Sequence, residues 1–123
     1  MLKQFFLVAV GGAAGSVLRF GVGLWGRSLK NTWWPWGTFA VNIVGCLIIG
    51  LLFALAIKQK GLSESAQLLL ATGFCGGLTT FSTFAFENFQ LLRQGNWAGF
   101  IGYTLLSVAM GLGAVALGWQ LVK

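Results

Sequence analysis

The chain has 123 residues, of which 57% are hydrophobic and only 8% charged, whereas about a quarter of an ordinary soluble domain is charged. This composition argues against a soluble globular domain and for an integral membrane protein. Two acidic residues and no histidine leave almost no general bases or metal ligands, so we expect no enzyme. The net charge of +6 comes from dispersed basic residues, which do not form a nucleic-acid-binding patch.

Four long apolar runs predict four transmembrane helices, because each has about the 20 residues that are needed to cross the hydrocarbon core. We expect these helices at about residues 5–26, 37–57, 66–92 and 97–122, joined by short connections. The six tryptophans fall at or near the ends of the runs, where indole rings prefer the headgroup level. The predicted fold is an all-α, four-helix membrane domain that occupies residues 1–123.

The basic residues divide almost evenly between the two predicted membrane faces. With four spans, the face that holds both termini collects four of them and the opposite face three: Lys3, Lys58, Lys60 and Lys123 against Arg27, Lys30 and Arg93. So weak a bias barely specifies an orientation. One copy of the chain hardly encloses a polar pathway, so we expect an antiparallel, dual-topology homodimer. A uniformly oriented protein with a weak bias is the alternative.

Polar side chains in the first two runs share helix faces with small residues. Arg19 follows Gly15 by four residues and should therefore face protein or water. It either attracts anions at a pore mouth or extends to the nearby interface. Asn42 forms a stripe with Thr38 and Gly45, and its buried amide either ties helices together or contacts a ligand.

The third run is the most informative, because it places two adjacent glycines and four hydroxyl side chains near mid-membrane. This combination weakens a helix, and we expect a break around Gly76 to Thr79. Unwound backbone at that depth is tolerated only where it is buried in protein or lines a cavity, and its carbonyls would face a cation. A straight helix with a small-residue packing face is the alternative.

Phe81 and Phe84 share one helix face just after the expected break. Two phenylalanines at this spacing are ordinarily core or lipid-facing residues. Their ring edges are electropositive, however, so with the hydroxyls of Ser82 and Thr83 they would also suit a small anion.

The fourth run carries a stripe that would extend such a polar track. Its members recur every four residues: Gly99, Tyr103, Ser107 and Gly111. Glu87, near the end of the third run, is the acidic residue at membrane depth, and it is either interfacial or part of an ion route.

Three strings resemble the fluoride-channel family called Fluc or CrcB. They read GFCGGLTTFSTF at residues 73–84, GGAAGSVLR at residues 11–19 and GTFAVN at residues 37–42. The resemblance implies a dual-topology homodimer with two antiparallel pores, through which fluoride leaves a microbial cytoplasm passively across the cell inner membrane. It also implies a structural sodium ion at the dimer centre, held by main-chain carbonyls of Gly76 and Thr79 from each subunit.

The same resemblance implies roles for residues along the pathway. Phe81 and Phe84 would line the pore, and Asn42 would meet fluoride beside them. Arg19 would line a vestibule. The polar track would be supplied by Ser82, Thr83, Tyr103 and Ser107. The fourth run departs from the family pattern, since Gly111 stands where a serine is expected one turn after Ser107; a water molecule or Thr104 would have to substitute.

Two other classes of membrane protein fit parts of the sequence. A proton-coupled small multidrug exporter also has four short helices, but it needs a carboxylate deep in its chamber, for which Glu87 is the sole candidate. A non-transporting membrane assembly factor would explain the glycine stripes. It would leave the string of hydroxyls and phenylalanines without a role.

Overall fold

A computed structural model describes residues 1–59 and 61–123, and the regular elements within them are all helical. The first span is α1 (Leu2–Ser28), the second is α2 (Trp36–Ala54) extended by the π-helical turn η1 (Leu55–Gln59), and the fourth is α6 (Trp97–Leu121). All four spans are long and apolar enough to cross a membrane. The chain is therefore an all-α, multi-pass membrane protein. Lys60, which entered the charge comparison, lies outside the described residues.

The third span is a broken helix with two halves. The first half runs through α3 (Glu64–Gln67), η2 (Leu68–Cys75) and α4 (Gly76–Leu78), and the second half is α5 (Phe81–Arg93). Between the halves, Thr79 and Thr80 are extended, with φ and ψ of −84° and 157° and of −150° and 122°. The predicted break is confirmed, but its expected position around Gly76 to Thr79 is corrected, because Gly76 and Gly77 remain helical.

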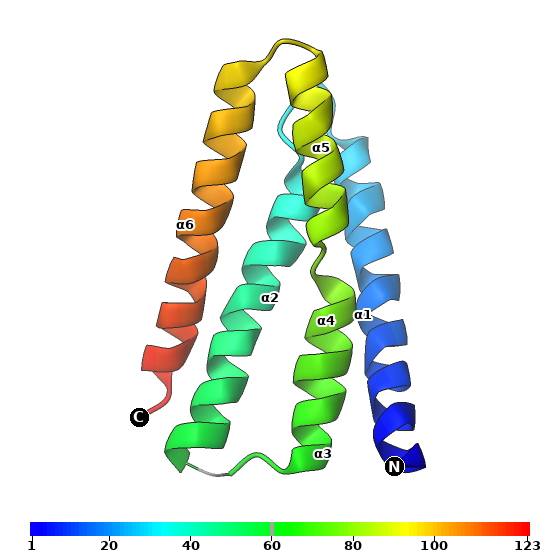
Figure 1. Cartoon of the computed structure of the whole chain (residues 1–123), viewed down its shortest axis with the longest axis vertical. Coiled ribbons are helices and arrows are strands. Elements are labelled where there is room, and N and C mark those ends of the chain that lie inside the picture. The colour runs from blue at the N-terminus through cyan, green and yellow to red at the C-terminus, as the bar shows by residue number, and fades with distance from the viewer. Residues whose placement is uncertain (60) are drawn as a thin grey trace.

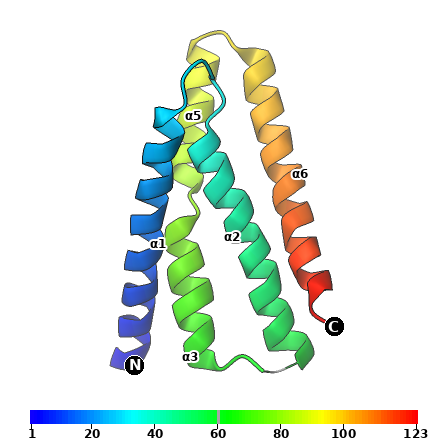
Figure 2. The same cartoon turned by 180° about the vertical axis from the view of Figure 1, so that it is seen from behind.

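The spans stand side by side, with both termini at the same end (Figure 1). α2 packs mainly against α6, and α1 packs mainly against η2 and α4, as the reverse view also shows (Figure 2). Beyond the break, α5 packs against α6 at the end opposite the termini. The break thus lets one span contact α1 with its first half and α6 with its second half.

Glycines bring α1 and the first half of the third span into backbone contact. A Cβ atom at Gly11 would overlap the Leu69 carbonyl, and one at Gly15 would overlap the Phe74 carbonyl. On the other side, a Cβ atom at Gly77 would meet the backbone of Gly12. Small residues drive helix association in membranes in this way, since they let backbones approach closely. Gly77 is therefore used for packing, and the helix breaks only after it.

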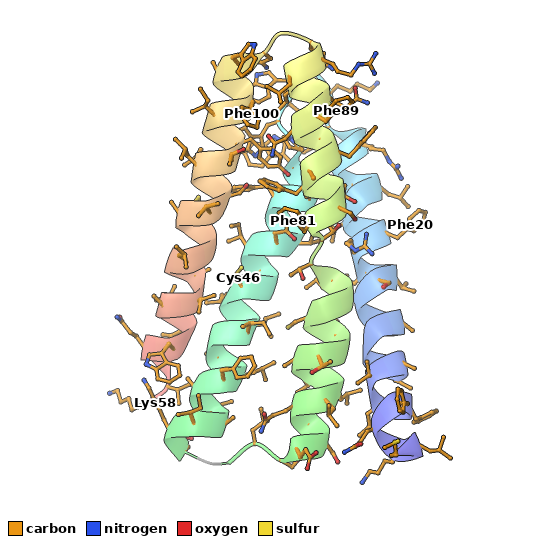
Figure 3. The ribbon with its side chains drawn as sticks, viewed as in Figure 1. Phe20, Cys46, Lys58, Phe81, Phe89 and Phe100 are labelled. Carbon is orange, nitrogen blue, oxygen red and sulfur yellow. The ribbon has the colours of Figure 1, made fainter. Side chains whose placement is uncertain are left out.

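The C-terminal end of α6 is held by a lysine from η1. Lys58 Nζ donates hydrogen bonds of 2.8 Å to the carbonyls of Trp119 and Val122, and it lies 4.7 Å from the centroid of the Trp119 ring. Figure 3 shows this side chain at the lower end of the molecule. A cation placed there satisfies carbonyls that have no partner at a helix C-terminus.

Candidate functional site

Asn42 joins α2 to the break in the third span. Its Oδ1 accepts a hydrogen bond of 2.8 Å from the Thr80 N–H, and its Nδ2 donates one of 3.1 Å to the Thr80 carbonyl. Both polar groups of Thr80's backbone are thus satisfied by one side chain from another helix. Of the two roles open to Asn42 in the sequence, the structure shows the one that ties helices together, and one Nδ2 hydrogen remains for a ligand.

Hydroxyl groups close the two helix ends at the break. The Thr79 hydroxyl and N–H both donate to the Cys75 carbonyl, at 2.9 and 3.0 Å, and so finish the first half. The Thr80 hydroxyl accepts from the Thr83 N–H at 3.2 Å, which makes Thr80 the N-cap of α5. The Thr-Thr pair therefore ends one helix and begins the next.

The break leaves main-chain carbonyls without helical partners. The Thr80 N–H, which a continuous helix would direct to the Gly76 carbonyl, is taken by Asn42. Arg19 Nε occupies the Gly77 carbonyl at 2.9 Å. In the described chain, no backbone donor from a neighbouring turn reaches the Gly76 or Thr79 carbonyl.

These carbonyls are the groups that suit a cation. Gly76 and Thr79 line one cavity of about 310 Å³, and a Cβ atom at Gly76 would meet nothing within 4 Å. Neutral main-chain oxygens fit a hard monovalent ion better than a transition metal, which prefers nitrogen and sulfur ligands. Among residues 1–59 and 61–123, no cluster of three His, Cys, Asp or Glu side chains is placed to hold a metal.

An open groove of about 370 Å³ runs beside the break between α2, α5 and α6, and we call it the aromatic groove. The predicted site residues on its walls are Asn42, Thr79, Phe81, Phe84 and Ser107. Phe81 is 80% exposed at the start of α5, beside the break (Figure 3), and its ring centroid lies 6.0 Å from that of Phe84. The structure thus brings the ring pair, an amide and a hydroxyl to one surface.

The other predicted polar residues do not line the aromatic groove. Ser82 is exposed, with its hydroxyl 3.4 Å from that of Thr80, and Thr83 faces the opposite side of α5 toward α1. Tyr103 is fully buried, and its ring centroid lies 4.9 Å from that of Phe84. The expected continuous track is therefore divided between two sides of α5 in a single chain.

Glu87 is half-buried at the end of the bundle opposite the termini. One carboxylate oxygen accepts a hydrogen bond from the Thr38 hydroxyl and the other accepts one from the Tyr103 hydroxyl, both at 2.8 Å. Trp34 packs next to these hydrogen-bonded side chains, with its ring centroid 5.3 Å from that of Tyr103. Thr38 was visible in the sequence as part of the Asn42 stripe, but its partnership with Glu87 was not.

A second cavity of about 370 Å³, which we call the α1–α2–α5 cavity, opens on the other side of α5. Its polar lining consists of Ser16, Arg19, Arg27, Thr38, Thr80 and Thr83. Arg19 makes two kinds of contact: it lines this cavity, and its Nε donates a hydrogen bond to the Gly77 carbonyl. Arg27 lines the same cavity but was not among the site residues predicted from the sequence.

Comparison with known proteins decides the family. A sequence model described as "CrcB-like protein, Camphor Resistance (CrcB)" matches residues 6–119. The chain belongs to the CrcB-like family. Similar proteins named fluoride-specific ion channel FluC occur in Chloroflexus aurantiacus (49% identity, 95% of this chain and 93% of the relative), in Azobacteroides pseudotrichonymphae (45%, 100% and 98%) and in Leptospira interrogans (40%, 98% and 95%).

On α6, Gly111 stands at the position where the resemblance in sequence predicts a serine. Gly111 is buried, and a Cβ atom there would lie 3.4 Å from Cys46 Sγ. Cys46 therefore lies next to the place where a serine side chain would project. The nearby Thr104 hydroxyl is buried and has no hydrogen-bond partner among the described residues. This hydroxyl lies on the same helix as Gly111, one turn before Val108, which lines the aromatic groove.

Proposed function

We propose that this protein is a fluoride channel, which lets fluoride leave the cytoplasm down its gradient and so lowers the cell's exposure to the ion. The observation that carries the proposal is the aromatic groove, where Phe81 and Phe84 lie beside the Asn42 amide and the Ser107 hydroxyl. The groove belongs to a chain whose full-length relatives are named fluoride-specific ion channels. A channel of this kind moves an ion and is not an enzyme.

The groove offers the groups that a small, strongly hydrated anion needs. Ring edges are electropositive, and the remaining Nδ2 hydrogen of Asn42 and the Ser107 hydroxyl are hydrogen-bond donors. A narrow passage rejects larger anions by size, and donors placed along it replace the water that fluoride loses. The Tyr103 hydroxyl hydrogen is directed to Glu87, so we assign Tyr103 to the wall of the pathway, behind Phe84.

Arg19, Thr83 and Ser82 form the approach to the pathway in this proposal. Arg19 and Thr83 line the α1–α2–α5 cavity, which meets the aromatic groove at Thr80. Glu87 keeps Thr38 and Tyr103 in place through its two carboxylate oxygens. Fluoride would therefore pass from a hydroxyl-lined cavity to the ring pair.

The pathway is completed by a second copy of the chain in opposite orientation. In a single chain the aromatic groove is open on one side, so one copy does not enclose a pore. The near-equal division of basic residues supports insertion in both directions. We therefore infer an antiparallel, dual-topology homodimer in the cell inner membrane.

A structural sodium ion at the dimer centre fits the residues present. The Gly76 and Thr79 carbonyls would hold it, and two subunits related by a two-fold axis would supply four neutral oxygens. When bound, the ion would neutralise carbonyl dipoles that the break leaves without donors. The chain's own contribution is to hold these carbonyls in place, through Asn42 on Thr80 and Arg19 on Gly77.

The experiment that separates a channel from an exporter is passive release. Purified protein in liposomes loaded with potassium fluoride should release fluoride down its gradient without an imposed proton gradient, once a potassium ionophore carries the balancing charge. A proton-coupled exporter would need such a gradient, and an assembly factor would release no fluoride under either condition. Glu87 does not favour the exporter, because both of its oxygens already accept hydrogen bonds inside the bundle.

A further inference from the structure

Two buried glycines let the backbones of α2 and α6 touch. A Cβ atom at Gly50 would overlap the Val115 carbonyl and lie 3.0 Å from the Val115 Cα atom. From the opposite helix, a Cβ atom at Gly118 would overlap the Leu47 carbonyl and lie 2.8 Å from the Leu51 nitrogen. All of these neighbours are backbone atoms, which cannot turn aside as a side chain can. Any side chain at either position must therefore push the two helices apart.

This backbone contact borders the aromatic groove. Val115 of α6 lines the groove, and so do Cys46 and Ile49 of α2. The atoms that a Cβ at Gly50 would strike thus belong to a residue of the groove wall. Since α2 and α6 form two of the walls, their separation sets the distance across the groove at the end nearer the termini.

α6 is also attached to the rest of the bundle on both sides of the glycine contact. Toward the C-terminus, Lys58 Nζ holds the carbonyls of Trp119 and Val122. Toward the other end of α6, the Tyr103 hydroxyl donates to Glu87. A group inserted between these attachments must displace the middle of α6, because close-packed interiors transmit strain rather than absorb it. The middle of α6 is the part that lines the groove.

We propose that Gly50 and Gly118 determine the anion selectivity of the channel by fixing the separation of α2 and α6, and with it the width of the aromatic groove. Both are positioning residues, which act on the ion only through the groove wall. The inference rests on the proposed function. It adds that part of the size limit is built into each chain, whereas a second copy closes the open side of the groove.

The size of the expected displacement follows from the contact distances. Carbon atoms in ordinary contact lie about 3.5–4.0 Å apart. A methyl group at Gly50 would start 3.0 Å from the Val115 Cα atom, so α2 and α6 should separate by roughly 0.5–1 Å. A passage that rejects larger anions by size should lose part of its selectivity when its walls move this far.

The test compares fluoride and chloride release from liposomes loaded with the potassium salt of each anion, in the presence of a potassium ionophore. Wild type should release fluoride and retain chloride. Gly50→Ala and Gly118→Ala should each release chloride, and the ratio of fluoride to chloride release should fall at least about tenfold, or roughly 1.4 kcal/mol in relative barrier height. Fluoride release itself should slow about threefold, because the donors on the two walls move apart.

The matched control is a glycine with the same kind of contact away from the groove. A Cβ atom at Gly11 would overlap the Leu69 carbonyl, between α1 and the third span, so Gly11→Ala should lower the unfolding temperature but leave chloride excluded. Gly113→Ala, on α6, meets nothing within 4 Å and should match wild type in both respects. Circular dichroism and a sizing column check that each variant is folded. Gly50→Ala and Gly118→Ala insert the methyl group from opposite helices, so either one that is folded decides the test.

Two results would overturn the inference. One is that the folded Gly50→Ala and Gly118→Ala variants retain chloride as wild type does. The other is that Gly11→Ala releases as much chloride as they do, which would mean that general loosening of the bundle causes the leak. Wild-type liposomes that released no fluoride would instead contradict the proposed function, so the two failures are distinguishable.

Discussion

Phe81 and Phe84 differ in how a single chain holds them. Phe84 is half-buried against Tyr103, whereas Phe81 is largely exposed on the aromatic groove. Isoleucine keeps much of the bulk of either ring but lacks its electropositive edge. We expect Phe81→Ile and Phe84→Ile to slow fluoride release from liposomes about tenfold, which corresponds to roughly 1.4 kcal/mol in the barrier.

The matched control for the ring pair is Phe89→Ile. Phe89 is exposed on the same helix but does not line the aromatic groove. This variant should release fluoride at the wild-type rate, and all three variants should elute from a sizing column as wild type does. Wild-type flux in both ring variants would assign Phe81 and Phe84 to packing alone.

Asn42 acts on stability through the two hydrogen bonds that it makes to Thr80. Asn42→Ala removes both and leaves a backbone N–H and C=O without partners at membrane depth, which should cost about 1–3 kcal/mol. Asn42→Asp keeps the acceptor for the Thr80 N–H, but only its protonated form can also donate to the Thr80 carbonyl, so its loss of stability should be smaller than that of Asn42→Ala at low pH only. Thermal unfolding in detergent measures the unfolding temperatures of wild type and both variants. An Asn42→Ala variant as stable as wild type would mean that Asn42 does not hold the break.

At the scale of the third span, its glycines have different surroundings although they are adjacent. A Cβ atom at Gly77 would meet the Gly12 backbone, whereas one at Gly76 would meet nothing within 4 Å. Gly77→Ala should therefore separate α1 from α4 and destabilise the single chain by about 1–3 kcal/mol. Gly76→Ala should leave the fold of the chain intact and act only where a second copy and a cation approach.

Two measurements separate these outcomes. Circular dichroism on heating should show a lower unfolding temperature for Gly77→Ala only. Cross-linking with and without sodium should show that Gly76→Ala reduces the dimer fraction and its dependence on sodium. A Gly76→Ala variant with an unchanged, sodium-dependent dimer would argue against a cation at this carbonyl.

The sequence predicts that the third span is broken but not the residue at which it breaks. Two glycines and four hydroxyls correctly predict that the third span is interrupted. They do not predict where, because the decisive contacts come from other helices: α1 backbone keeps Gly77 helical, and Asn42, 38 residues away, holds Thr80 extended. The N-cap at Thr80 is the local signal, since its hydroxyl meets the Thr83 N–H.

At the scale of the whole molecule, the four spans are readable from the sequence because charges are scarce and, apart from Arg19 and Glu87, lie near the span ends or between the spans. The side chains of the pathway are harder to group, since helical periodicity gives a face but not its neighbour. Thr83 illustrates this: its sequence position beside Phe84 suggests one common track, yet it lines the α1–α2–α5 cavity. Arg27 was counted only toward the orientation because it lies near the end of its span, where basic residues are ordinary.

Dual topology is a property that labelling can measure. Apart from Arg19, the described basic residues lie at opposite ends of the molecule, with Lys3, Lys58 and Lys123 at one end and Arg27, Lys30 and Arg93 at the other. A cysteine added at the C-terminus should therefore react with an impermeant reagent in about half of the molecules in intact cells. Added lysines in the loop between α1 and α2 should shift that fraction. Labelling from one side only would contradict the antiparallel dimer.

The central claim, that the aromatic groove passes fluoride and rejects larger anions, is tested most directly by comparing fluoride and chloride release from the same liposomes. Ion-selective electrodes should record rapid fluoride release and no chloride release above the level of protein-free liposomes. Closure of the open groove by a second copy predicts this result, because the narrowed passage would exclude the larger chloride by size while ring edges and donors replace water around fluoride. Equal release of both ions, or retention of fluoride, would contradict the account.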